Sequence, residues 1–150
     1  ELVMLIEKLI KNRKKISYKT NFKEGDNYTS KLSDNISKKT DKQFIEQITS
    51  IIYRECGKSD HLLTLLSSEM CLSQSQLNRK IKSATGFTTS CFVLKVRLNK
   101  AKMMLAKSSK PIGEIAVECG FNDFAYFSHA FKKEFGMTPT CYQRLPDSTN

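Results

Sequence analysis

Residues 62–86 read LLTLLSSEMCLSQSQLNRKIKSATG, and residues 111–136 read PIGEIAVECGFNDFAYFSHAFKKEFG. The two stretches carry one pattern twice, at an offset of 49 residues before a central turn (66 to 115) and of 50 residues after it (77 to 127). The matching pairs are Leu66 and Ile115, Ser67 and Ala116, Glu69 and Glu118, Leu72 and Phe121, Leu77 and Phe127, Ile81 and Phe131, and Gly86 and Gly136. This internal repeat indicates two copies of one supersecondary unit.

Each copy predicts a helix, a tight turn and a second helix. Ser67 and Ala116 are small, which lets the first helix cross close to the second. In the first copy, Ser73 is a suitable N-cap for the second helix and Gly86 a suitable end. This layout is that of a helix-turn-helix, whose second helix is free to enter a major groove. A helical repeat array would explain a duplication too, but such arrays need about three copies or more.

The other elements between residues 41 and 145 are also predicted to be helical, because no strand-like alternation of useful length occurs there. Asp41 is the expected N-cap of a helix that ends near Gly57. The segment 89–107 is apolar on two sides, so we expect it to be a long helix that links the two helix-turn-helix units. Pro111 should occupy the first position of the next helix, and Pro139 should stop helix growth after Gly136. The predicted fold is all-α.

The first 40 residues differ in character from the rest. Residues 1–16 carry apolar side chains at helical spacing, which predicts an amphipathic helix whose partner surface lies outside this chain. Residues 17–40 are polar and contain Gly25, Asp26 and Asn27, as expected of a flexible linker. Residues 41–145 then form the main domain, with a frayed tail at 146–150. We interpret the chain as a piece of a longer protein.

Positive charge is concentrated along the chain. The net charge is +10, and no Asp or Glu occurs between Ser73 and Lys110. The nine basic residues of this window are Arg79, Lys80, Lys82, Lys95, Arg97, Lys100, Lys102, Lys107 and Lys110. Such a surface attracts a polyanion, of which duplex DNA is the commonest.

Other functional classes find little support. The sequence has no Gly-rich phosphate loop and no Ser, His and acid constellation, so an enzyme is not expected. Cys56 and His61 lack a second pair at metal-ligand spacing, so neither a metal nor another cofactor is expected. The five cysteines are widely spaced, which favours reduced thiols in the cytoplasm, mostly buried as small apolar groups. A basic helical module that docks an acidic protein partner remains the alternative function.

The helical wheel selects the residues that point away from the core in the second helix of each copy. In the first copy, Ser75, Arg79 and Lys82 point outward, flanked by Gln76 and Asn78. In the second copy these are Ala125, His129 and Lys132, flanked by Ser128 and Lys133. An Arg can bind guanine with two hydrogen bonds, and Asn or Gln can do so with adenine. Lys residues near helix ends more often bind phosphates.

At Leu62–Arg144 the sequence resembles the DNA-binding domain of the AraC/XylS family of bacterial transcription regulators. The matching pieces are Ser73-x-Ser75-x-Leu77-x-Arg79, Arg97-Leu98-x-x-Ala101, Ile115-Ala116-x-x-Cys119-Gly120-Phe121, and Tyr126-Phe127-x-x-x-Phe131-Lys132-x-x-Phe135-Gly136-Met137-Thr138-Pro139-x-x-Tyr142. The resemblance covers about half of the chain in the right order. It implies two homeodomain-like helix-turn-helix units that read adjacent major-groove segments.

Base-contacting positions of the family map onto both copies. With the outward residues above, the candidate base contacts are Ser75, Gln76, Asn78, Arg79, Phe124, Ala125, Ser128 and His129. The candidate phosphate contacts are Lys82, Lys95, Arg97, Lys132 and Lys133. Ala125 and His129 stand where the family usually offers longer donors, so the second unit is expected to read few bases.

Several of these residues have a structural alternative. Arg97 could form an internal salt bridge instead of binding phosphate. Phe124 could pack within its unit rather than touch a thymine methyl group, and His129 could be an idle surface residue or a pH-sensitive neighbour. Tyr126 and Tyr142 are expected in the core, with their hydroxyls reaching the surface.

Residues 1–60 resemble the region that precedes the DNA-binding domain in hybrid two-component sensors. This resemblance implies that residues 1–16 are the last helix of a phosphorylatable receiver domain, and that the parent protein carries a histidine kinase elsewhere. It also implies a cytoplasmic location for this chain, with a parent protein that could be anchored in the inner membrane. The implied partners are promoter DNA, a second copy bound through the upstream region, and RNA polymerase, with no small-molecule ligand.

Overall fold

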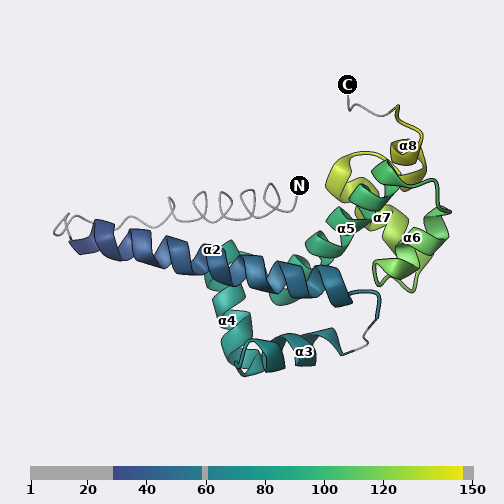
Figure 1. Cartoon of the computed structure of the whole chain (residues 1–150). Coiled ribbons are helices and arrows are strands. Elements are labelled where there is room, and N and C mark those ends of the chain that lie inside the picture. Colours follow the sequence, from purple (N-terminus) through teal and green to yellow (C-terminus); the bar gives the residue numbers. More distant parts are fainter. Residues whose placement is uncertain (1–28, 59–60, 147–150) are drawn as a thin grey trace. The chain divides into compact units, whose positions relative to one another are not determined.

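The computed structural model describes the backbone of residues 29–58 and 61–146, and side chains from residue 40 onward (Figure 1). All regular elements in these ranges are helices, which confirms the predicted all-α fold. They are α2 (Thr29–Glu55), α3 (Leu62–Glu69), α4 (Gln74–Thr85), α5 (Thr89–Lys107), α6 (Ile112–Glu118), α7 (Phe124–Phe135) and α8 (Pro139–Gln143). The helix expected at residues 1–16, the first part of the expected linker (17–28) and all but residue 146 of the expected tail (146–150) lie outside the described residues.

The described chain divides into two compact units. The first comprises α2 as far as Ile51 together with residues 63–92, and the second comprises residues 52–62 together with the chain from Val93 onward. Each unit therefore contains one copy of the repeat, α3 and α4 in the first and α6 and α7 in the second. Helix α5 runs without interruption from Thr89 to Lys107 and contributes residues to both units, as its two apolar stripes predicted.

The core of the first unit consists of the inward residues that helical spacing selects. Leu77 and Ile81 of α4 are almost fully buried, four residues apart on one face. The other buried apolar residues of this unit include Phe44, Ile45, Ile48, Leu66, Ala84 and Phe92. Lys80 lies on the surface of the same helix with its Nζ 4.5 Å from the centre of the Phe44 ring. One face of α4 is thus fixed in the core, which leaves the opposite face exposed.

The core of the second unit is built on aromatic side chains. Phe127 and Phe131 of α7 are fully buried, with ring centres 5.8 Å apart, and Phe121 lies 4.9 Å from Phe127. Their buried neighbours are Leu98, Ala101, Leu105, Ile115, Ala116 and Cys119. The ring of Tyr142 packs edge-on against Phe131 at 5.8 Å, as expected of a core tyrosine. Aromatic pairs at these distances add specific contacts to the apolar burial.

Helix α2 begins earlier than the sequence interpretation proposed. It starts at Thr29, so Asp41 lies inside the helix rather than at its N-cap, and residues 29–40 are helical rather than linker-like. The physical reason is visible in the sequence, because no Gly or Pro interrupts the segment Thr29–Glu55, and Leu32 and Ile36 continue the helical spacing backward. The polar composition of residues 29–40 was therefore not sufficient to predict a linker there.

Two prolines occupy positions other than those predicted. Pro111 is the N-cap residue of α6, with φ −55° and ψ 140°, rather than its first helical residue. Pro139 does not end the helical structure but begins α8, whose N-cap Thr138 accepts a hydrogen bond from the Cys141 N–H. Proline suits the first helical position because its fixed φ is helical and its missing N–H needs no partner there.

In the described part of the chain, none of the helices has the length and hydropathy required to cross a membrane.

Candidate nucleic-acid interface

The turn between the two helices of each copy has the same hydrogen bond. In the first copy, the Leu72 N–H donates to the Ser67 carbonyl at 3.0 Å, and in the second, the Phe121 N–H donates to the Ala116 carbonyl at 2.9 Å. The residue before each donor has positive φ, which is 55° at Cys71 and 90° at Gly120. This agreement at backbone level supports the sequence repeat as far as Leu72 and Phe121, after which the second copy has one extra residue, Asn122, before its helix cap.

The second helix of each copy is capped at both ends. Ser73 and Gln76 form a capping box, in which the Gln76 N–H donates to the Ser73 hydroxyl and the Ser73 N–H donates to the Gln76 side chain. In the second copy the N-cap is Asp123, whose side chain accepts a hydrogen bond from the Tyr126 N–H at 3.1 Å. Both helices end at a left-handed glycine, Gly86 with φ 78° and Gly136 with φ 81°.

The structural match between the two copies continues beyond Gly86 and Gly136, where the repeat found in the sequence ended. The Thr88 hydroxyl accepts from the Cys91 N–H at 3.3 Å, and fifty residues later (88 to 138) the Thr138 hydroxyl accepts from the Cys141 N–H at 3.3 Å. Helix α8 is therefore the counterpart of the first turn of α5. The signal was present in the sequence, since Gly86-x-Thr88-x-x-Cys91 matches Gly136-x-Thr138-x-x-Cys141.

Helix α4 presents an exposed polar face. Ser75, Asn78, Arg79 and Lys82 are all exposed, as the helical wheel predicted. Within the described residues, Ser75 and Arg79 have no hydrogen bond or ion pair from their side chains, whereas the Lys82 Nζ donates to the Gly86 carbonyl at 2.8 Å. Arg79 is therefore the long donor of this face that no described residue engages, and it can make two hydrogen bonds to a flat acceptor edge.

The two amides of α4 are less available than their outward positions suggested. The Gln76 Oε1 accepts from the Ser73 N–H at 3.0 Å, as part of the capping box. The Asn78 Oδ1 accepts from the Thr89 hydroxyl at 2.6 Å. Both amide oxygens are thus turned toward the fold, and only the amide nitrogens are left to face a ligand.

Helix α7 presents a shorter and more aromatic face. Ala125, His129, Lys132 and Lys133 are exposed, and Ser128 is half-buried. Phe124 is 52% exposed although its ring centre lies 6.3 Å from that of Phe127, so it is partly packed and partly open to a ligand. The exposed groups on this face are therefore short, aromatic or positively charged.

The prediction that Tyr126 belongs to the core is wrong. The residue is 53% exposed, and its ring makes only a tilted contact with Phe121 at 6.4 Å. Its neighbour Phe127 is the one that fills the core, because α7 begins after the Asp123 cap and therefore turns Phe127 and Phe131 inward. The first turn of α7 thus carries two partly exposed aromatic side chains, Phe124 and Tyr126.

Much of the positive charge of α5 is engaged inside the second unit. The Lys95 Nζ pairs with Glu134 at 3.0 Å, and both side chains are half-buried. The Lys100 Nζ donates to the Tyr53 carbonyl at 2.9 Å and lies 5.2 Å from the centre of the Tyr53 ring. The Lys102 Nζ lies 4.9 Å from the Phe135 ring centre. These lysines pack their stems and charges against their own unit.

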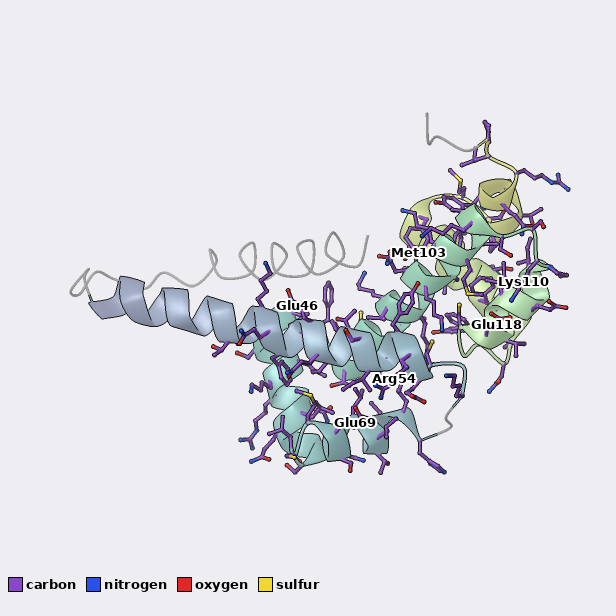
Figure 2. The ribbon with its side chains drawn as sticks, viewed as in Figure 1. Glu46, Arg54, Glu69, Met103, Lys110 and Glu118 are labelled. Carbon is purple, nitrogen blue, oxygen red and sulfur yellow. The ribbon has the colours of Figure 1, made fainter. Side chains whose placement is uncertain are left out.

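Two further basic residues of the stretch from Ser73 to Lys110, Lys110 and Arg97, differ in their partners. The Lys110 Nζ donates to Glu118 at 2.9 Å, and Figure 2 shows the two side chains side by side. This hydrogen bond, together with the charge of Glu118, raises the pKa of Lys110. Arg97 is half-buried, its Nε is buried, and the structure of residues 29–58 and 61–146 describes no ion pair for it. The expected internal salt bridge of Arg97 is therefore absent from that part.

Only two of the five cysteines are buried, so the prediction of mostly buried thiols is wrong. Cys56 and Cys119 are buried, Cys91 is partly exposed, and Cys71 and Cys141 are exposed, all five with free thiols. Burial raises the pKa of Cys119 to about 12, with a smaller effect of the neighbouring Cys56 in the same direction. Among the residues that the structure describes, no group of three His, Cys, Asp or Glu residues could hold a metal ion.

Known proteins share the sequence of this region. Residues 66–145, more than half of the chain, match the family described as a helix-turn-helix domain. The probable transcriptional regulator LumQ of Photobacterium leiognathi is 44% identical over 78 residues, which are 52% of this chain and 32% of that protein. Histidine kinase P4 of Formosa agariphila is 31% identical over 103 residues, which are 69% of this chain and 8% of that protein. The chain spans only a small part of these curated relatives.

A solved structure shares both the fold and a fair part of the sequence. It is the C-terminal domain of AraT, a response regulator from Geobacillus stearothermophilus. The sequence identity is 30%, and the TM-score is 0.59 over 71% of this chain and 91% of that one. The similarity therefore extends over nearly the whole of that solved domain.

Proposed function

The chain belongs to the AraC-type helix-turn-helix family, and on that premise we propose that it binds double-stranded DNA sequence-specifically as the output part of a bacterial transcription regulator. The observation that carries the proposal is the pair of capped helices α4 and α7, each buried on one face and polar on the other. A helix held in this way behind a tight turn can enter a major groove with its exposed face toward the base edges.

Helix α4 is the main reader in this proposal. Its exposed Arg79 can bind guanine through O6 and N7, which discriminates among bases by ~1–3 kcal/mol. Ser75 and Asn78 flank it on the same face, while Gln76 chiefly serves the cap. The absence of acidic residues from α4 keeps a phosphate backbone from being repelled there.

Helix α7 contributes mainly phosphate contacts and few base contacts in this proposal. Ala125, Phe124 and the half-buried Ser128 offer contacts of short reach, and His129 is its longest candidate for a base edge. Lys132 and Lys133, exposed in the last turn of α7, are suited to phosphates. The second unit therefore adds affinity and a few base contacts, in the groove segment next to the one that α4 reads.

The acidic-partner alternative loses part of its basis. It required the lysines of α5 to be available for docking, yet Lys95 pairs with Glu134, and Lys100 and Lys102 lie against rings of their own unit. Exposed basic side chains without a described partner include Arg79 on α4 and Lys132 and Lys133 on α7, whereas on α5 only Lys107, in its last turn, is of this kind among the described residues. This distribution favours DNA over an acidic protein.

We also propose that the parent protein is a two-component regulator. Two matched proteins bear such names, a histidine kinase and a response regulator, and the kinase match extends over 69% of this chain. Phosphorylation of an upstream receiver would then control DNA binding by this part, in the cytoplasm, with or without an inner-membrane anchor elsewhere in the parent. A second copy and RNA polymerase are the further partners in this proposal.

The deciding experiment is selection of bound duplexes from a random DNA pool with the full chain, at two salt concentrations. A motif in two blocks about one helical turn of DNA apart would support reading by both units. A single block would assign base reading to one unit and leave the other on the backbone. Salt-sensitive binding without any motif would overturn sequence-specific recognition, and an absence of binding would favour the docking alternative.

Arg79→Ala, compared with Lys42→Ala, identifies the unit responsible. Lys42 is exposed on α2, outside both reading helices, so its loss removes the same charge from another helix. Loss of the motif in the Arg79 variant and its retention in the Lys42 variant would assign the block to α4. An equal loss in both would contradict a specific role of α4.

A further inference from the structure

The amide of Asn78 is fixed by a residue outside its own helix. The Thr89 hydroxyl, at the first residue of α5, donates to the Asn78 Oδ1 at 2.6 Å. Thr89 is only 7% exposed, whereas Asn78 lies on the exposed face of α4, and both belong to the first unit. The oxygen of the amide is therefore turned inward, and its nitrogen is the atom that faces outward.

The second copy of the repeat lacks this arrangement. The residue equivalent to Thr89 is Pro139 (89 to 139), which begins α8 and is buried like Thr89. The residue equivalent to Asn78 is Ser128 (78 to 128). Because proline has no hydroxyl group, the helix start itself does not require the hydrogen bond. The hydrogen bond between Thr89 and Asn78 therefore occurs in the first copy only, which is the copy that carries Arg79.

We propose that Thr89 is a positioning residue that fixes the Asn78 amide for DNA recognition, with Nδ2 as an outward donor. The proposal rests on the proposed function and names what that site selects. A donor fits an acceptor edge best where two acceptors adjoin, as N7 and O6 of guanine do. Bidentate recognition of adenine needs the amide oxygen as well, and here Thr89 holds that oxygen toward the fold. Asn78 therefore favours an acceptor-rich base pair, with guanine first.

The test is duplex selection with the full chain and four variants: Thr89→Val, Thr89→Ser, Asn78→Ala and the Thr89→Val/Asn78→Ala double variant. Asn78→Ala should flatten the base preference at one base pair, at which the wild type selects G·C. Thr89→Val should lower the discrimination at that same base pair by about three- to tenfold and admit adenine, because the amide is then free to turn over. Thr89→Ser keeps the hydroxyl and should keep the wild-type preference.

The double variant separates positioning from mere stability. If Thr89 acts through Asn78, Thr89→Val changes nothing further in the Asn78→Ala background. A further change there, an effect at other base pairs, an unchanged profile of Thr89→Val, or a wild-type preference for an A·T pair at that position would each overturn the proposal. Ser90→Ala, which removes an exposed neighbouring hydroxyl, should leave the profile unchanged. A wild type that selects no motif would refute the proposed function itself.

Discussion

The Lys95 Nζ lies 3.0 and 3.1 Å from the two carboxylate oxygens of Glu134, so an ion pair connects α5 to the reading helix α7. The two side chains are only 21% and 22% exposed, which shields the pair from water and salt more than a surface pair is shielded. The sequence had assigned Lys95 to phosphate binding alone. The ion pair predicts an effect of Lys95 on stability, whereas phosphate binding predicts an effect on DNA affinity.

Replacing Lys95 by Met should lower the free energy of unfolding by about 1–2 kcal/mol, because it leaves a half-buried carboxylate without its partner. The Lys95→Met/Glu134→Gln double variant should recover most of that loss in urea unfolding experiments. If Lys95 also binds phosphate, the double variant will still bind every duplex more weakly, and to the same extent. Wild-type DNA affinity in the double variant would restrict Lys95 to the ion pair.

Arg79→Ala should reduce discrimination between the selected duplex and one with a changed base pair by ~1–3 kcal/mol, while stability stays within about 0.5 kcal/mol because the side chain is exposed. Lys132→Ala, the matched removal of a charge from α7, should instead weaken binding to both duplexes alike and reduce the salt dependence by about one phosphate contact. Competition binding at several salt concentrations measures both quantities. Equal losses on both duplexes for both variants would contradict this division.

Gly120→Ala should be far more damaging than Gly136→Ala, although both glycines have positive φ. A Cβ at Gly120 would overlap the backbone carbonyl of Cys56, whereas a Cβ at Gly136 meets no atom within 4 Å. We expect a loss of about 3 kcal/mol or more at Gly120, from overlap and backbone strain together, and ~1 kcal/mol at Gly136, from the left-handed backbone alone. Thermal unfolding of the two variants provides the comparison, and equal midpoints would show that the close approach to Cys56 relaxes freely.

The raised pKa of Cys119 predicts a loss of stability in alkaline solution. The thiol is neutral in the folded protein up to about pH 12, but it ionises near pH 9 once the chain unfolds. Its contribution is therefore complete below pH 9 and is lost as the pH rises from 9 toward 12. Relative to Cys119→Ala, the wild type should lose on the order of 1 kcal/mol between pH 8 and pH 10 in urea unfolding. Parallel pH profiles for the two proteins would contradict a buried, neutral thiol.

The helix-turn-helix repeat could be predicted from the sequence because its signals are local. Leu77 and Ile81 lie one helical turn apart, Ser73 can only reach the N–H groups just after it, and Gly86 tolerates a left-handed backbone. These chemical preferences need no distant partner, so both copies and the long helix α5 were found with their ends close to the observed ones. The start of α2 and helix α8 were missed although their signals, an unbroken helical run and the Thr138-Pro139 pair, are local too.

The sequence by itself determined the buried residues of α4 and α7 and most of the side chains that point away from the core, with Tyr126 as the exception. Only the tertiary structure decided which of these side chains remain available to a ligand. Asn78, Lys95 and Lys100 have partners 11, 39 and 47 residues away in the chain. A helical wheel describes one helix and its core, whereas such partners come from other elements that folding brings near. Fewer charged side chains are therefore available to a ligand than the sequence suggested, and Arg79 is the exposed arginine of α4 that no described residue engages.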